Sequence, residues 1–283
     1  MKVAYFIALY KMPRQFAWLW RALENPDDCF ILHIDRNASP EIRDEVERIV
    51  GERDNVRYLE PIPTAWGGWS LGRIELDAIA LACGWRGDWS FFMNLSGQDY
   101  PIRRLDEIRD FLSRHHGSNF VEVQPVSDQP FHIRRRPYTL AIERKGRLLR
   151  LPIPVLFPWR PAIDWYGLGW HILSRDFCNW ITETAFTSAV SRRLKYTDNP
   201  CEHFMQVLLM NSPFRDRLIR DDKRFGRWTE DRTGHAVLTR NDIDALQASS
   251  DLFGRKFDET VDAEALHRMA ELTRSPVPDH AAG

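Results

Sequence analysis

The chain has 283 residues, with 39 Lys and Arg against 40 Asp and Glu, and 43% of its residues are hydrophobic. This composition excludes a disordered or collagen-like chain. A net charge of −1 offers nucleic acid no whole-molecule electrostatic attraction. The four Cys residues form no CxxC pair, and no apolar stretch approaches the roughly 20 residues of a membrane span. The apolar run 3–9 is too short for a signal sequence, so we expect a protein of the reducing cytoplasm.

In the first half of the chain, short apolar β-rich runs alternate with amphipathic segments. Strands are predicted at 3–9, 29–34, 56–59, 89–95 and 120–123, and helices at 13–23, 40–50, 70–82 and 105–115. Strands that alternate with helices form βαβ units. The sequence therefore predicts an α/β fold, with a mainly parallel twisted sheet flanked by helices.

Polar residues follow two of these strands directly. His33 and Asp35 come after the second strand, and a dense polar group from Asn94 to Asp99 comes after the strand at 89–95. Ligands of parallel sheets bind beyond the carboxyl ends of the strands, so these side chains are candidates for a binding site. Alternatively, Ser96 and Asp99 simply stabilise the turn before Pro101.

The second half of the chain changes character. Segment 124–161 has several prolines and no clear period, and it carries a cluster of cations: Arg134, Arg135, Arg136, Arg144, Lys145, Arg147 and Arg150. The segment is either a solvated excursion or a contact surface for an anionic or membrane-bound partner. Helical segments are predicted from Ser174, over 199–210 and, as the last helix, from Asp242. The chain beyond Arg274 is expected to be loose.

The usual signatures of kinases, Rossmann domains, zincins and α/β-hydrolases are absent from the sequence. A Trp-Gly-Gly-Trp phrase at 66–69 predicts a tight turn packed by indoles, with Ser70 as the N-cap of the next helix. The only DxD sequence, Asp242-Ile243-Asp244, follows Thr239 at the spacing of a capping box, which favours a structural role over metal binding.

Two further short segments carry charged residues that could take part in catalysis or bind an anion. Glu202 lies at the start of an apolar helix, where it either interacts with the helix N-terminus, worth about 0.3–1 kcal/mol, or acts as a general base. Arg255 and Lys256 lie between Phe253 and Phe257. They are either solvated charges or cations that hold a diphosphate without a metal.

Taken in order, these phrases resemble the Core-2/I-branching enzyme family, glycosyltransferase family 14, which also contains the peptide xylosyltransferases. The matching segments are 3–7, 32–35, 66–75, 92–101, 169–175, 200–206 and 252–258. The resemblance implies a GT-A-like fold, with one domain over 1–274 and a tail over 275–283. It also implies an inverting enzyme that uses a UDP-sugar as co-substrate and needs neither a divalent metal nor another cofactor.

The resemblance also assigns roles to residues. Glu202 corresponds to the family's general base, although Cys201 replaces the Asp that precedes it in the family phrase. Lys256 corresponds to the cation that binds the diphosphate, and Arg232 or His235 to a second one. The remaining donor-side candidates are His33, Asp35, Trp69, Ser70, Glu75, Asp99 and Arg255. The acceptor-side candidates are Trp228, Arg134 and Arg135.

The expected function is transfer of GlcNAc or xylose from a UDP-sugar to a hydroxyl of a glycan, lipid-linked or peptide acceptor. The chain resembles a bacterial, cytoplasmic relative, active in polysaccharide biosynthesis and in peripheral contact with the inner membrane surface. A glycoside hydrolase needs two opposed carboxylates, and only Glu202 has a suitable setting. A non-catalytic sugar-binding protein that retains the fold stays open, because Cys201 departs from the family phrase.

Overall fold

The central sheet has seven strands in the order β12-β6-β11-β4-β1-β2-β3 in a computed structural model that describes residues 1–155, 161–230 and 234–278. The strands are β1 (Val3–Leu9), β2 (Cys29–Ile34), β3 (Val56–Tyr58), β4 (Phe91–Ser96), β6 (Asn119–Val121), β11 (His171–Ser174) and β12 (Leu218–Ile219). Within the described ranges, β11 alone runs antiparallel to its neighbours. This architecture confirms the predicted α/β class with a mainly parallel sheet.

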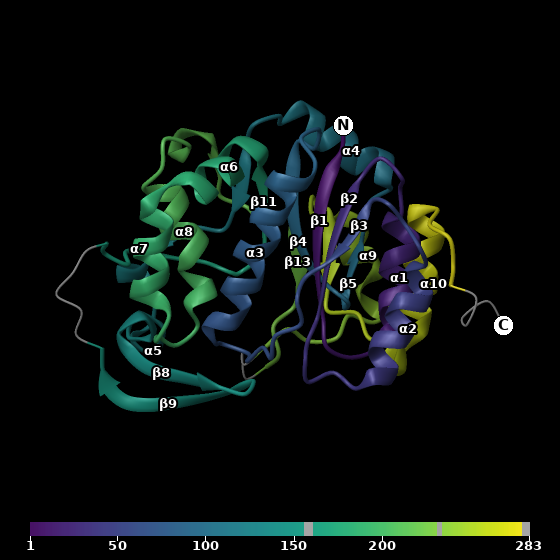
Figure 1. The fold of residues 1–283 in the computed structure, drawn as a ribbon. Coiled ribbons are helices and arrows are strands. Elements are labelled where there is room, and N and C mark those ends of the chain that lie inside the picture. The colour runs from purple at the N-terminus through teal and green to yellow at the C-terminus, as the bar shows by residue number, and fades with distance from the viewer. Residues whose placement is uncertain (156–160, 231–233, 279–283) are drawn as a thin grey trace.

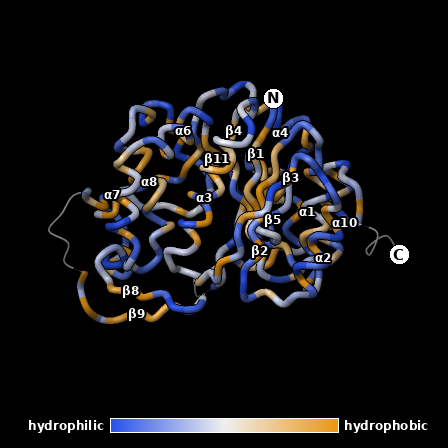
Figure 2. Tube along the Cα trace, viewed as in Figure 1, coloured by the Kyte–Doolittle hydropathy of each residue, from blue (hydrophilic) through white to orange (hydrophobic). Residues whose placement is uncertain are grey.

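Helices cover both faces of this sheet (Figure 1). One face packs against α1 (Pro13–Leu23), α2 (Pro40–Val50) and α4 (Leu105–Arg114). The other packs against α3 (Trp69–Trp85), α6 (Arg175–Glu183), α7 (Ala185–Leu194) and α8 (Phe204–Met210). Successive residues of β1 point to opposite faces, so that Tyr5 and Ile7 join the first core and Ala4 and Phe6 the second. Strands covered on both sides read as continuous apolar runs, which the central strands show in Figure 2.

A smaller sheet and a third core lie beside α1. The sheet consists of β5 (Asp99–Pro101), β14 (Phe253–Arg255) and β13 (Arg224–Gly226). The third core includes Trp18, Tyr100 and Phe257, and α9 (Ile243–Ala248) and α10 (Glu259–Thr273) contribute to it. The predicted last helix from Asp242 therefore ends at Ala248, because β14 interrupts it, and α10 follows. Val277 packs against this core, in the segment predicted to be loose.

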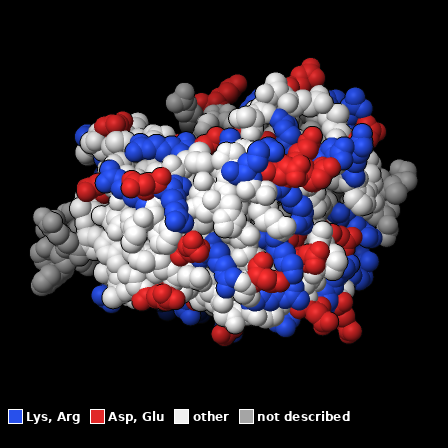
Figure 3. All heavy atoms as spheres, turned by 90° about the horizontal axis from the view of Figure 1, so that it is seen from above, with Lys and Arg blue, Asp and Glu red and all other residues white. Residues whose placement is uncertain are grey.

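The basic segment after β6 forms more structure than its sequence predicts. It contains β7 (Gln124–Pro125), α5 (Phe131–Arg134) and an antiparallel hairpin of β8 (Thr139–Arg144) and β9 (Arg147–Pro154), and β10 (Trp165–Tyr166) pairs with β7. In Figure 1 the hairpin lies at the bottom of the molecule, below α7 and α8, with its turn pointing toward the central sheet. The opposite end, seen in Figure 3, carries acidic and basic side chains that are intermixed.

One predicted helix cap is wrong and another is confirmed. Helix α3 begins at Trp69 with Gly68 as its N-cap, so Ser70 lies inside the first turn rather than before it. Its backbone N–H donates to Glu143 Oε2 of β8 at 2.9 Å, so a carboxylate from the hairpin replaces the local cap. Thr239 and Asp242 form the predicted capping box. Within the described residues, no helix is both long and apolar enough to cross a membrane.

Candidate active site

Glu202 lies in a short 3-10 turn, Pro200–Glu202, that is fixed from two sides. Before the turn, Asn199 adopts a left-handed conformation with φ of 49° and donates its N–H to the Gly67 carbonyl at 3.0 Å. After it, the Glu202 carbonyl accepts the Gly167 N–H at 2.9 Å. Backbone bonds on both sides therefore orient the Glu202 side chain, which is 21% exposed.

The Glu202 carboxylate forms an ion pair with Arg136, whose Nη1 donates to Oε2. Burial raises the pKa of Glu202 above its ordinary value, and the Arg136 guanidinium acts in the opposite direction. The phenol of Tyr166 lies beside the same guanidinium, and burial raises its pKa to about 12. This group holds a partly buried carboxylate that is accessible to solvent and paired with a cation, an arrangement that suits a proton acceptor.

The neighbouring Cys201 has a different environment from Glu202. Its Sγ is 3.6 Å from the position that a Cβ on Gly72 of α3 would take, and burial raises the pKa of the thiol. Glu75, a predicted donor contact on the same helix, binds His171 Nε2 at 2.6 Å and is buried. Since Cys201 faces α3 while Glu202 faces Arg136, the charged support of Glu202 comes from the basic segment and not from position 201.

A cationic group lies at the ends of β1 and β14. Burial lowers the pKa of Lys256, and the positive charges of Lys11 and Arg255 lower it further. Arg255 itself is 13% exposed, lies 3.9 Å above the Trp170 ring and is 3.5 Å from Asp99. In the described part of the chain, Lys256 has no carboxylate within ion-pair distance. Lys256 is thus the better placed of the two cations to meet an anionic ligand.

Asp99 and Arg255 form part of a buried ion-pair cluster. The Asp99 carboxylate is fully buried, accepts the Ser96 N–H and hydroxyl at 2.6 Å each, and lies 3.7 Å from Arg224. These contacts within the turn before Pro101 favour the alternative interpretation, in which Asp99 stabilises that turn. Because Asp99 has no exposed surface, it cannot contact a ligand and instead pairs with Arg224 and Arg255.

Asn94 connects the cationic side of the edge to the Glu202 side. Its carbonyl accepts from Arg224 Nη2 at 3.1 Å, and its amide donates to the Gly169 carbonyl at 2.7 Å. The Cα of Gly169 in turn faces Cys201, at 3.7 Å from the position of a built Cβ. Asn94 at the end of β4 therefore binds both Arg224, in the cationic cluster, and Gly169, whose Cα lies near Cys201.

The residues predicted on the uridine side lie at the same edge, but their polar atoms have partners. His33 Nε2 accepts the Ile62 N–H at 3.3 Å, and burial lowers its pKa to about 4. Asp35 accepts the backbone N–H groups of Asn37 and Thr64. Their contacts hold the loops that follow β2 and β3.

The predicted aromatic and acceptor-side residues separate into packed and exposed ones. Trp69 packs edge-on against Phe204, with ring centroids 5.1 Å apart. Trp228 is 49% exposed and stacks on His235 at 4.7 Å, and burial lowers the pKa of that histidine to about 4. Arg134 and Arg135 are exposed at the end of α5. Arg232 lies outside the described residues.

Three residues at this edge were not predicted as site residues. Arg136 belongs to the same run as Arg134 and Arg135, and nothing local distinguishes it from them. Lys11 directly follows β1, so the rule that ligands bind at carboxyl ends of strands would have found it. Trp66 is 71% exposed, with Arg150 5.9 Å from its ring centroid, so it and not Trp69 is the accessible indole of the phrase.

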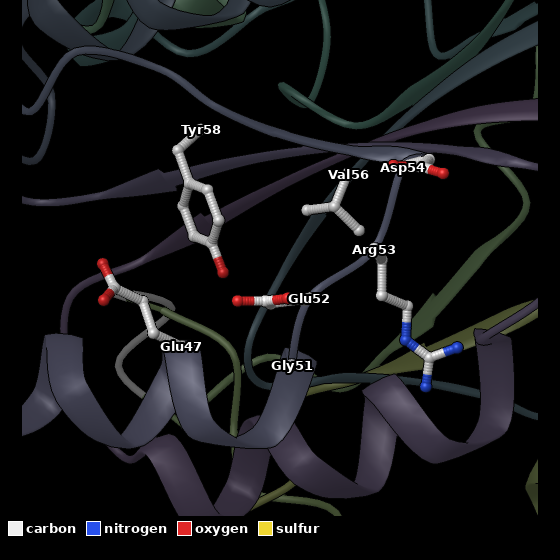
Figure 4. Close-up of a pocket in the computed structure, with 7 residues that line it drawn as sticks. All are labelled: Glu47, Gly51, Glu52, Arg53, Asp54, Val56 and Tyr58. Atoms are coloured by element: carbon white, nitrogen blue, oxygen red, sulfur yellow. The ribbon is translucent and has the colours of Figure 1, made fainter.

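A surface pocket exists elsewhere, between the end of α2 and the start of β3 (Figure 4). Its lining residues are Glu47, Gly51, Glu52, Arg53, Asp54, Val56 and Tyr58. It lies at the amino end of the parallel strands, and its lining has three carboxylates and one guanidinium. Such a pocket repels a diphosphate.

In residues 1–155, 161–230 and 234–278, no three His, Cys, Asp or Glu side chains converge in a group that could hold a metal ion. The DxD carboxylate Asp242 is buried and bound by Arg227 Nε at 2.8 Å as well as by the Thr239 N–H.

Comparisons with known proteins found curated relatives that are named xylosyltransferases. The chain is 27% identical to Xylosyltransferase 2 of Rattus norvegicus over 94% of its own length and 33% of the relative's. It is 27% identical to Xylosyltransferase 1 of Homo sapiens over 80% of its length and 24% of the relative's. The chain thus spans a third or less of these curated relatives.

Solved structures of glycosyltransferases are similar to the chain at low identity. The galactosyltransferase LgtC, in complex with donor and acceptor sugar analogs, has a TM-score of 0.45 and 11% identity, covering 99% of this chain and 98% of its own. S. aureus TarS in complex with UDP-GlcNAc has a TM-score of 0.32 and 15% identity, over 46% of this chain and 36% of its own. A family model described as Core-2/I-Branching enzyme matches residues 3–249. The chain therefore belongs to the Core-2/I-Branching enzyme family.

Proposed function

We propose that this protein is an inverting, metal-independent glycosyltransferase that moves xylose or GlcNAc from a UDP-sugar to a hydroxyl of a glycan, lipid-linked or peptide acceptor. The observation that carries the proposal is the partly buried Glu202 carboxylate, which forms an ion pair with Arg136. The cations grouped around Lys256 support it. The names of the curated relatives favour xylose.

In the proposed reaction, Glu202 takes the proton from the acceptor hydroxyl. The acceptor oxygen attacks the anomeric carbon as the bond from that carbon to UDP breaks, which inverts the configuration. Lys256 and Lys11 stabilise the negative charge that grows on the departing diphosphate. A general base of this kind contributes about 10²–10⁴ in rate.

Metal independence is supported by the roles of the DxD residues. Asp242 stabilises the start of α9 and pairs with Arg227, and Asp244 is exposed. The charge that a divalent ion supplies in other transferases would come here from fixed cations. We expect full activity in EDTA, and a strict requirement for Mn²⁺ would refute this part of the proposal.

The decisive variant is Glu202→Gln, which keeps the size of the side chain and removes its basicity. We expect loss of transfer by at least about 10² with unchanged UDP binding. Asp244→Asn serves as the matched control, since it removes an exposed carboxylate from the DxD sequence and should leave activity intact. Wild-type turnover by Glu202→Gln would exclude Glu202 as the base, and absence of turnover in the wild type would favour the sugar-binding alternative.

A further inference from the structure

The hairpin of β8 and β9 has an inner face that contacts the elements around the candidate active site. Glu143 binds the N-terminus of α3, and Arg150 Nε binds Asp198 Oδ1 at 2.7 Å. Ala141, opposite Arg150 in the register, is 1% exposed. These residues anchor the hairpin to the molecule through one side only.

The outer face of the hairpin has no partner in the described part of the chain. Ile142 pairs with Leu149 and Arg144 with Arg147, so these four side chains share the face opposite to Glu143 and Arg150. Ile142 is 40% exposed and Leu149 is 59% exposed, and both arginines are exposed. The hairpin contains one acidic residue, Glu143, which lies on the inner face. The outer face is therefore both cationic and aliphatic.

The segment that leads into the hairpin also carries exposed cations and an exposed aromatic side chain. Phe131 is 69% exposed on α5, and Arg134 and Arg135 follow it at the surface. Figure 1 places α5 directly beside β8. Figure 2 shows hydrophobic positions along β9, away from the buried cores. The charges here have one sign, whereas those at the opposite end of the molecule are intermixed (Figure 3).

Exposed cations and exposed aliphatic side chains together suit one class of partner. Anionic headgroups attract Arg and Lys, and apolar side chains gain by entering the boundary between headgroups and acyl chains. A nucleic acid or an acidic polymer would bind the cations but would offer no apolar environment to the aliphatic side chains. Large exposed apolar side chains that lie next to each other are typical of interaction surfaces.

We propose that the outer face of the β8–β9 hairpin, together with Phe131–Arg135, docks on an anionic lipid bilayer. Docking through this face brings the Glu202 edge close to the membrane, because the inner face of the same hairpin contacts α3 and Asp198. The proposal concerns membrane binding alone and stands apart from sugar transfer, so the two fail independently.

The test is co-sedimentation of the purified chain with vesicles of phosphatidylcholine alone or mixed with phosphatidylglycerol. We expect binding to the mixed vesicles only. Arg144→Glu with Arg147→Glu should lower the partition coefficient by at least about tenfold, since each basic side chain near an anionic surface contributes about fivefold. Ile142→Ser with Leu149→Ser should lower it by about five- to tenfold.

The matched control is Arg48→Glu with Arg114→Glu, the same charge change at the other end of the molecule, which should leave vesicle binding unaltered. Only variants whose Tm equals that of the wild type are compared. If the double variant Arg144→Glu with Arg147→Glu is less stable, Arg144→Gln with Arg147→Gln replaces it. Absence of vesicle binding, or equal loss in the control, overturns the proposal. A second outcome also overturns it: Ile142→Ser with Leu149→Ser binds vesicles like the wild type, and polyglutamate or RNA competes fully. The surface would then recognise charge alone.

Discussion

Glu202 is subject to two opposing electrostatic effects. Burial favours its neutral form, whereas the Arg136 guanidinium favours the carboxylate that a general base requires. The two residues are 66 positions apart in the sequence and meet because the basic segment folds back over the Pro200 turn. In the proposed mechanism Arg136 therefore acts through Glu202, as a positioning residue rather than a catalytic one.

Arg136→Ala should raise the pKa of Glu202 and reduce kcat by about ten- to a hundredfold near neutral pH. Because the base must be deprotonated, the acid limb of the kcat profile should move to higher pH, and the loss should be largest at low pH. Arg136→Lys, which keeps the charge, should move the limb back toward the wild type. A pH–rate profile of the three proteins measures this; a lower Tm with an unmoved acid limb would show that Arg136 is merely structural.

At the scale of elements, the Trp66–Trp69 turn is where α3, the hairpin and the Pro200 turn meet. Gly67 has φ of 77°, and a Cβ there would lie 2.7 Å from Asn199 Oδ1 and 2.8 Å from Arg150 Nη2. A Cβ on Gly68 would lie 2.5 Å from the Glu143 carboxylate. The two glycines thus allow three elements to approach each other closely enough to fix the position of Glu202.

Gly67→Ala should destabilise the protein by about 1–3 kcal/mol, through both the left-handed backbone and the displaced neighbours, and should lower kcat as the Pro200 turn shifts. Gly84→Ala is the matched control. No atom lies within 4 Å of its built Cβ, and a helical alanine there should stabilise by about 0.4–1 kcal/mol. Urea unfolding compares the two, and equal stabilities would contradict the proposed close approach.

At the scale of the whole molecule, a net charge of −1 conceals an uneven distribution. The amino end of the sheet carries mixed charges and a pocket rich in carboxylates, whereas the carboxyl end gathers Lys11, Arg255 and Lys256. The proposed anionic donor would therefore be attracted to one end of the sheet. The same end carries the basic outer face of the hairpin.

UDP should raise the Tm of the protein by an amount that grows with its concentration, since it binds the folded state. At a hundred times Kd the gain is about 2.7 kcal/mol, or several degrees, and EDTA should not reduce it. Lys256→Met should weaken UDP binding by about tenfold or more, because a hydrogen bond to a charged group is lost. Lys2→Met, at the other end of the molecule, should not. Equal thermal shifts in the two variants would remove Lys256 from the donor site.

Local sequence patterns determined the regular elements of the first part of the chain. The bounds of β1, α1, β2 and α2 agree with their prediction, because burial on one or both faces imposes a period that short windows reveal. The phrases around Glu202 and Lys256 likewise pointed to the family that the comparison confirms. Ser70 was misjudged as a cap, since the real partner of the helix terminus, Glu143, is 73 residues away.

The tertiary structure alone decided the hairpin, the partner of Glu202 and the burial of Asp99 and Arg255. The hairpin has one anchored and one exposed face, with arginines on both strands and prolines on β9, so its sequence shows no clean alternation. The pairs Arg136–Glu202 and Asp99–Arg255 join distant positions, and a window of neighbouring residues carries no information about which of several arginines a carboxylate will meet. Sequence periodicity records which face of an element is buried, whereas contacts between loops depend on how the elements pack together.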